Sequence, residues 1–402
     1  MRLPGTTYGR RDRPVLISLF GTFLPRGMPH IYRQVCEVEG FDHWVVTRRR
    51  KNERAYPFPR VVALRRSVLR GLSRFWCRWQ RRRMPFLPSE VRQILWFSCQ
   101  RRADVVHVYL GNVAAQLFDY LAREQAARIV SFHGGDLSDH ITPAEYRRLS
   151  THADLFLVRS ESLRAALEQR GIPPERIRLN PTGVPIPTGF VAKTAPSPGQ
   201  PVRVLQACRL IAKKGLDVSM KGVHRLVQTG RNVTLDLAGA GPEGRSLRML
   251  AAELGIAQRV RFLGFLDNSA LLRSLPDYDV FVHPSRTTSC GDREGIPNSL
   301  LEAMANGVPV VATRHSGIPE AITDERDGLL IDRAEPGALA RAVQRLLDCP
   351  QLYANISRAA HETVAARFSL AVSSRLLETA YREAAVLAET RHRSPLRLRR
   401  AA

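Results

Sequence analysis

Long apolar runs are missing from this sequence of 402 residues. No window of about 18 residues is apolar throughout, which excludes a helix that spans a membrane. The first apolar run, Val15–Phe20, is too short for a secretory signal, and no small-residue cleavage site follows it. We therefore expect a cytoplasmic protein.

Cysteine is also scarce. The six cysteines are Cys36, Cys77, Cys99, Cys208, Cys290 and Cys349. No two stand close enough to form a C-x-x-C pair, and a chain of this length does not need disulfides to hold its core together. The sequence therefore predicts reduced thiols, with no disulfide framework, no metal site and no cofactor.

Acidic residues are few relative to basic ones. The chain has 61 Lys and Arg against 37 Asp and Glu, a formal net charge of +24. Residues 1–110 alone carry 23 basic and seven acidic side chains. Nine arginines and no acid lie between Arg60 and Arg83, with Phe75, Trp76 and Trp79 among them. A basic tail closes the chain, with five arginines from Arg391 to Arg400.

A basic stretch with interleaved aromatic residues is typical of a segment that lies on an anionic membrane surface or binds an anionic lipid. Alternatively, the basic stretch is a solvated surface, or it binds the phosphates of a nucleic acid. No nucleic-acid-binding motif accompanies the charge, so we expect no nucleic acid partner. The favoured interpretation is a peripheral position at the inner face of the plasma membrane.

Short apolar strands alternate with amphipathic helices along the whole chain, which predicts an α/β fold with parallel sheets. Strands are expected at Val15–Phe20, Trp44–Val46, Val105–Tyr109, Ile129–Phe132, Leu155–Val158, Ile177–Leu179, Arg203–Ala207, Thr234–Ala238, Val260–Leu263, Val280–His283, Val310–Thr313 and Leu329–Ile331. Helices are expected at Val113–Arg123, Ser162–Arg170, Leu216–Gln228, Leu247–Leu254, Pro297–Ala305, Ala338–Leu347, Leu352–Arg367 and Leu370–Ala388.

A Pro- and Gly-rich segment at residues 181–201 interrupts this alternation and predicts a hinge. We expect an N-terminal Rossmann-like domain over 1–184, a linker over 185–201 and a second Rossmann-like domain over 202–369. A helix over 370–390 would cross back to the first domain, and the basic tail would follow over 391–402. Two doubly wound sheets so joined face a cleft, and ligands of such sheets bind at the carboxyl ends of the strands.

Two strand-to-helix loops in the second half have the composition of a diphosphate site. Cys208–Gly215 places Arg209 and Lys214 before a helix, and such cations can neutralise phosphate oxygens without a metal. Gly239–Pro242 is a tight turn after the next strand. It lacks the acidic ribose partner of a nicotinamide site, so that cofactor is not expected.

A third loop carries the richest pattern. Pro297 is expected in the first turn of a helix, so the amides of Ile296 and Asn298 would lie at a helix N-terminus, where anions bind. Glu294 precedes this helix and Glu302 lies inside it, eight residues on. Because carboxylates only accept hydrogen bonds, two so spaced suit hydroxyls at different parts of one sugar-containing ligand.

These segments together resemble the retaining glycosyltransferases of the GT-B fold that carry an E-x7-E motif. This large family includes sucrose synthase and bacterial exopolysaccharide transferases, and the wording here is similar to the colanic-acid-type branch. The matching segments are Phe132–Asp136, Cys208–Gly215, Gly239–Pro242, His283–Ser285, Glu294–Thr313, Ser316–Glu320 and Asp327–Leu330.

The resemblance implies a role for each matching residue. Arg209 and Lys214 would bind the donor diphosphate and stabilise its departure. Glu302 would accept from the ribose hydroxyls, and Glu294 from hydroxyls of the transferred sugar. The amides of Ile296, Pro297 and Asn298 would face the sugar or phosphate, with Pro297 supplying only its backbone position. On the opposite wall Gly21 would approach the diphosphate and His133 the sugar, while Gly264, Phe265 and Leu266 would flank the base.

The function implied is transfer of a sugar, with retention, from a nucleotide-diphosphate donor to a glycan or lipid-linked acceptor in cell-envelope or exopolysaccharide synthesis. Two alternatives stay open. One is a non-hydrolysing nucleotide-sugar epimerase, which shares the architecture and needs no acceptor. The other is a membrane- or polyanion-binding protein on a relic transferase fold.

Overall fold

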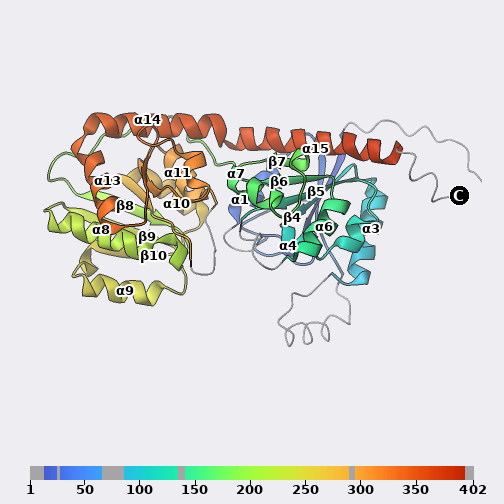
Figure 1. The fold of residues 1–402 in the computed structure, drawn as a ribbon, viewed down its shortest axis with the longest axis horizontal. Coiled ribbons are helices and arrows are strands. Elements are labelled where there is room, and N and C mark those ends of the chain that lie inside the picture. The colour runs from blue at the N-terminus through green and yellow to red at the C-terminus, as the bar shows by residue number, and fades with distance from the viewer. Residues whose placement is uncertain (1–12, 25–27, 66–85, 135–140, 289–294, 394–402) are drawn as a thin grey trace, which may run out of the picture.

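Two parallel sheets organise the chain, as the alternation of strands and helices predicts (Figure 1). The computed structural model describes residues 13–24, 28–65, 86–134, 141–288 and 295–393. One sheet has seven strands and lies within residues 15–179, and the other has six and lies within residues 202–331. The prediction of an α/β fold with two Rossmann-like units is confirmed.

The N-terminal sheet has the order β3-β2-β1-β4-β5-β6-β7, and every neighbouring pair is parallel. Its strands are β1 (Val15–Phe20), β2 (Asp42–Thr47), β3 (Val61–Ala63), β4 (Val105–Tyr109), β5 (Ala127–Phe132), β6 (Leu155–Val158) and β7 (Ile177–Leu179). Its helices are α1 (Pro29–Cys36), α3 (Pro88–Arg101), α4 (Gly111–Ala114), α5 (Phe118–Leu121), α6 (Pro143–His152) and α7 (Glu161–Glu168).

The C-terminal sheet has the order β10-β9-β8-β11-β12-β13 and is again parallel. Its strands are β8 (Val202–Ala207), β9 (Val233–Ala238), β10 (Val260–Gly264), β11 (Val280–His283), β12 (Val310–Thr313) and β13 (Leu329–Ile331). Its helices are α8 (Leu216–Gln228), α9 (Gly244–Glu253), α10 (Asn268–Ser274), α11 (Asn298–Ala305), α12 (Ile318–Ala321), α13 (Pro336–Asp348) and α14 (Pro350–Arg367).

Local differences from the sequence prediction have identifiable causes. The single helix expected at Val113–Arg123 is two short helices, α4 and α5, because the amides of Gln116 and Leu117 bond three residues back rather than four. The half-buried and exposed positions 112, 115, 116, 119, 122 and 123 recur at helical spacing through both short helices, so the sequence pattern does not reveal the break. Strand β3 was not expected; it lies at the edge of the sheet, and its three residues are half-buried or exposed.

Two predicted helix starts also shift. Pro297 is the N-cap of α11 with extended backbone (φ −70°, ψ 128°), so the helix begins one residue later, at Asn298. The helix after the Gly239–Pro242 turn begins at Gly244. The fixed φ of proline suits a position just before a helix as well as one inside its first turn.

The last helix, α15 (Leu370–Arg393), returns to the N-terminal domain and lies against β4 and β5, as the red ribbon in Figure 1 shows. Leu377, Tyr381 and Ala384 of α15 are fully buried with residues of β1, β4 and β5 in one apolar cluster. The Oη of Tyr381 also forms a hydrogen bond of 2.8 Å with Nδ1 of His107, which is itself fully buried. One face of the N-terminal sheet is therefore covered by the C-terminal end of the described chain.

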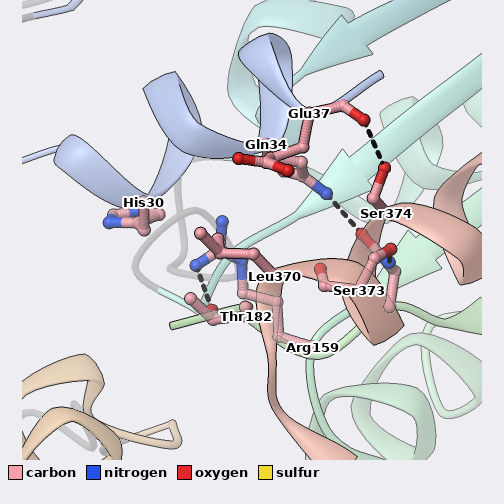
Figure 2. A pocket seen from close by; sticks show the side chains of 10 residues that line it. His30, Gln34, Glu37, Arg159, Thr182, Leu370, Ser373 and Ser374 are labelled. Atoms are coloured by element: carbon pink, nitrogen blue, oxygen red, sulfur yellow. Dashed lines mark hydrogen bonds between the residues drawn. The ribbon is translucent and has the colours of Figure 1, made fainter. Parts of the chain in front are cut away.

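Both crossings between the domains meet at one junction. Val184 pairs with Ser369 in an isolated parallel bridge, and a Cβ on Gly183 would lie 2.9 Å from the Cα of Leu370. Beside it is a cavity of about 10 Å³, room for a single water (Figure 2). Around it Asn180 donates to the Ser373 carbonyl at 2.8 Å, and Ser374 donates to the Glu37 carbonyl at 2.6 Å. This network of direct hydrogen bonds fastens α1, the exit of β7 and the start of α15 to one another.

Replacing Tyr381 by alanine should destabilise the N-terminal domain by about 3–5 kcal/mol, since a large buried aromatic side chain is lost. Tyr381→Phe should cost about 1 kcal/mol for the His107 hydrogen bond. All four tryptophans lie in residues 1–184, so the urea midpoint of tryptophan fluorescence reports on this domain. As control, Val386→Ala on the same helix, where the side chain is 63% exposed, should shift the unfolding free energy by less than about 0.5 kcal/mol. Equal midpoints for the alanine variants at 381 and 386 would contradict the packing of α15 as a core element.

Candidate functional site

A cavity of about 220 Å³ lies at the carboxyl ends of β8 and β9 and receives residues from both domains. The C-terminal domain contributes most of the wall, and Pro29 and Tyr56 contribute from the N-terminal domain. The remaining lining residues are Ala207, Cys208, Arg209, Ala238, Gly239, Ala240, Phe265, Leu266, Asn268, Leu271, Asn298, Ser299 and Glu302. We call it the interdomain pocket, and it lies where open α/β sheets bind their ligands.

Close backbone contact brings the first two loops of this wall together. A Cβ on Gly239, whose φ is +150°, would lie 1.8 Å from the Cys208 carbonyl oxygen. A Cβ on Gly241 would lie 2.3 Å from the Leu210 carbonyl oxygen. Only glycine permits these approaches, and they hold Arg209 next to the turn after β9.

Helix α11 enters the pocket through its first turn. Asn298 and Ser299 line the pocket, and Ser299 Oγ donates to the Ala207 carbonyl at 2.6 Å, which ties α11 to the end of β8. The first helical amide with a partner four residues back is that of Leu301, so the amides before it have no such helical bond. The pocket therefore receives the positive end of a helix dipole.

Glu302 is the buried carboxylate of the pocket, with 2% of the residue exposed. It accepts from Asn268 Nδ2 at 2.8 Å and from Arg33 Nη1 at 3.1 Å. Burial raises the pKa of Glu302 above its ordinary value, while Arg33 and Asn268 oppose that shift. Because Arg33 belongs to α1 of the N-terminal domain, this ion pair joins the two domains at the pocket itself.

A second carboxylate joins the domains outside the pocket. Glu320, on α12, accepts from the amide of Glu161 at 2.6 Å and from the amide of Ser162 at 2.9 Å. These amides open α7 of the N-terminal domain, where a negative charge is favourable. The carboxylate of one domain therefore caps a helix of the other.

His133 directly follows β5 on the N-terminal side of the cleft. Its Nε2 lies 2.9 Å from Ser131 Oγ. Burial, followed by the positive charge of Arg159, holds the pKa of His133 well below its ordinary value. Burial also lowers the pKa of His30, whose ring centroid is 6.3 Å from that of His133. Both imidazoles are therefore neutral at pH 7.

The predicted site residues fall into three groups. Arg209, Phe265, Leu266, Asn298 and Glu302 line the interdomain pocket together. Gly21 lines a separate hollow in the N-terminal domain, and Lys214, Ile296, Pro297, Gly264 and His133 lie outside the pocket's lining. Glu294 falls outside the described residues, as do Gly135 and Asp136 of the loop after β5.

Lys214 is more enclosed than the sequence suggests, with 8% of the residue exposed. Its carbonyl accepts from Gln206 Nε2 at 2.7 Å. The next residue, Gly215, has φ +63° and would place a Cβ 2.0 Å from the Pro284 carbonyl oxygen. The loop is therefore packed tightly against the segment after β11, and Arg209 is its cation in the pocket lining.

Three residues of the site carry no sequence signal of their own: Arg33, Tyr56 and Asn268. Asn268 follows Asp267, the N-cap of α10, which is the only local hint. Arg33 and Tyr56 act on the opposite domain. Glu320 does so too, and although it lies in the matching segment Ser316–Glu320, a pattern within one segment does not reveal such a contact. Among the described residues no cluster of His, Cys, Asp or Glu has the arrangement of a metal site, and no helix is long and apolar enough to cross a membrane.

Comparison with known proteins identifies the family. A model described as glycosyl transferases group 1 matches residues 191–363, and one described as glycosyltransferase family 4 matches residues 33–186. The colanic acid biosynthesis glycosyltransferase WcaL of Escherichia coli strain K12 is 34% identical over 341 residues, covering 80% of this chain and 82% of WcaL. The chain belongs to the group 1 glycosyltransferases.

A second relative and a solved structure show how far the similarity extends. The amylovoran biosynthesis glycosyltransferase AmsK of Erwinia amylovora is 34% identical over 250 residues, or 61% of each chain. The crystal structure of HepE from Anabaena in complex with UDP superposes with a TM-score of 0.72 at 18% identity, covering 92% of this glycosyltransferase and all of HepE. The GT-B architecture is thereby confirmed.

Glu320→Ala should open the cleft of this glycosyltransferase, because α7 loses the cap that the other domain supplies. A cap contributes about 1 kcal/mol, which shifts a domain-closure equilibrium roughly fivefold. Small-angle X-ray scattering without ligand should give a larger radius of gyration. Glu325→Ala is the matched control, since exposed Glu325 pairs with Arg345 inside the same domain. Indistinguishable radii for wild type and Glu320→Ala would contradict the role of this contact in closure.

Proposed function

We propose that this glycosyltransferase moves a sugar, with retention of anomeric configuration, from a nucleotide-diphosphate donor to a glycan or lipid-linked acceptor. The pathway we propose is exopolysaccharide or cell-envelope synthesis, the setting named for WcaL and AmsK. One observation carries the proposal: buried Glu302 opens onto a pocket that also holds Arg209 and the first turn of α11.

In this proposal each part of the pocket binds a different part of the donor. Arg209 and the amides that open α11 bind the diphosphate, with Lys214 adding positive charge behind them. Glu302 accepts from the ribose hydroxyls, since a carboxylate suits hydroxyl donors. Phe265, which is 55% exposed, and Leu266 flank the base. The UDP named in the structure of HepE supports a nucleotide-containing ligand for this enzyme.

The reaction breaks the bond between the anomeric carbon and the diphosphate, and the electron pair leaves with the diphosphate. The acceptor oxygen attacks the same face of the anomeric carbon, and its proton passes to a non-bridging oxygen of the departing phosphate. Positive charge around the diphosphate is the main catalytic requirement. Glu294 and neutral His133 are assigned to the hydroxyls of the transferred sugar, and no covalent intermediate is invoked.

The two alternatives are not favoured. An epimerase would change the configuration of the donor sugar without an acceptor. A transferase would not, so we expect the sugar's configuration to stay unchanged when the enzyme is incubated with donor alone. A relic fold that only binds polyanions does not need the buried Glu302 carboxylate, which requires partners from two domains to be stable.

Glu302→Gln should weaken nucleotide-sugar binding by about 10-fold or more, because charged hydrogen bonds to the ribose are lost. Isothermal titration with a panel of UDP- and GDP-sugars measures this, with exposed Glu362→Gln as the control. Arg209→Ala should lower turnover by about 100-fold through the leaving diphosphate. Absence of binding by every sugar nucleotide in the panel would refute the proposed function.

Wild-type affinity should fall as the pH drops through the pKa of Glu302. Since burial raises that pKa, the loss begins above the range of an ordinary glutamate. Protonation removes the negative charge that Arg33 and the ribose hydroxyls recognise. Binding titrations at several pH values measure this loss of affinity toward low pH, which should be absent in Glu302→Gln. If that variant shows the same loss, another group is responsible for the pH dependence.

We also propose that the enzyme works at the inner face of the plasma membrane through its basic N-terminal part. It should sediment with vesicles containing phosphatidylglycerol, and less so as salt is added. Arg81→Ser, Arg82→Ser and Arg83→Ser in one chain should reduce sedimentation. The same number of changes at exposed Arg245, Arg326 and Arg341 of the C-terminal domain should reduce it less. Equal sedimentation with neutral vesicles would contradict the proposal.

A further inference from the structure

A second hollow, of about 400 Å³, lies at the carboxyl edge of the N-terminal sheet. The exits of β1, β2 and β4 form its walls together with the first turn of α1. Met28 lines this hollow, and the next residue, Pro29, lines the interdomain pocket. The two cavities therefore lie on either side of the same helical turn, and we call the second one the acceptor hollow.

The lining of the acceptor hollow is mainly apolar. Phe20 and Tyr109 stack at 4.5 Å between ring centroids and form its floor, and both are buried. Leu24, Ile31 and Val113 extend this surface. A bare sugar, with a hydroxyl on almost every carbon, would leave most of its donors without partners on such a wall. The apolar surface fits hydrocarbon instead.

Two arginines line the hollow, and only one of them has its charge neutralised by a carboxylate. Arg48 is neutralised, since its Nε lies 3.1 Å from Oε2 of fully buried Glu90 and its guanidinium lies 3.5 Å above the Phe86 ring. Arg49 is exposed, and in the described parts of the chain no carboxylate pairs with it. Its backbone is fixed, because its carbonyl accepts from the Phe23 amide at 2.7 Å and from Thr47 Oγ1 at 2.9 Å.

An apolar cavity with one uncompensated cation on an anchored backbone is complementary to an amphiphile whose anionic group adjoins hydrocarbon. The excess of basic residues in 1–110 adds a long-range field of the same sign. We infer that the acceptor hollow holds the phosphate and adjoining hydrocarbon of a lipid-phosphate-linked acceptor, with the phosphate at Arg49. The acceptor sugar then lies toward the α1 turn, next to the donor.

This inference rests on the proposed function and names the chemical class of its acceptor. It goes beyond a basic membrane-facing surface, because it places one lipid phosphate at one residue. It also separates two sources of anion, since free phosphate has no hydrocarbon to bury. The series of straight-chain alkyl phosphates from ethyl to octyl isolates the apolar contribution.

Titration calorimetry of wild type with this series should show affinity rising about fourfold per methylene until the hollow is filled. Inorganic phosphate and neutral octyl glucoside should bind at least 10-fold more weakly than octyl phosphate. Arg49→Ala should weaken every alkyl phosphate by about 10-fold and leave the dependence on chain length intact. Arg92→Ala, an exposed arginine of α3 in the same domain, is the matched control and should change neither.

Affinity that does not depend on chain length would overturn the inference in favour of a simple anion site. An unchanged affinity in Arg49→Ala would overturn it in favour of apolar binding alone. Val113→Phe, which narrows the hollow, should shorten the chain length at which affinity stops rising, and a correct fold is verified by its tryptophan fluorescence. Wild type that binds sugar nucleotides but no alkyl phosphate refutes only this inference, whereas failure to bind any sugar nucleotide refutes the proposed function.

Discussion

The buried charge of Glu302 constrains how the two domains meet. An isolated carboxylate at this depth would be strongly unfavourable, and its two partners come from different domains. The carboxylate is therefore fully compensated only when α1 lies against the C-terminal wall. Tyr56 and Pro29 reach the interdomain pocket from the same side. The pocket is complete only when the cleft is closed, so in the proposed function donor binding and domain closure are coupled.

The electrostatic character of the two walls differs. The C-terminal wall combines Arg209 with the opening of α11, a compact source of positive potential beside a single carboxylate. The N-terminal wall holds histidines that burial keeps neutral, Arg33, which pairs with Glu302, and Arg48 and Arg49 farther along the sheet edge. A neutral imidazole can donate or accept a hydrogen bond without repelling a cationic neighbour. Such a division suits the proposed reaction, in which negative charge develops on the departing diphosphate.

How far the sequence predicts this structure depends on the range of each interaction. Twelve of the thirteen strands could be placed within two residues at either end, because each is a short apolar run bounded by turns. Only β3 was missed. Arg209, Phe265 and Glu302 could be identified because each lies in a loop or helix with a distinctive pattern. Arg33 and Asn268 could not, since their importance comes from a partner far away in the chain, and the same holds for the contact of Glu320 with α7, although Glu320 lies in a matching segment. The enclosed position of Lys214 likewise depends on Gly215 packing against Pro284.

The return of α15 to the first domain has a consequence for biosynthesis. Its buried residues complete the face of the sheet that carries Leu16, Val105 and Ile129. During translation this sheet emerges well before α15, because the entire C-terminal domain lies between them, and at ribosomal rates the interval is about 10 to 40 seconds. Throughout that interval the apolar face of the sheet that α15 later covers stays exposed to solvent. The nascent chain therefore presents a natural target for ribosome-associated chaperones, and the first domain matures only after the second has been made.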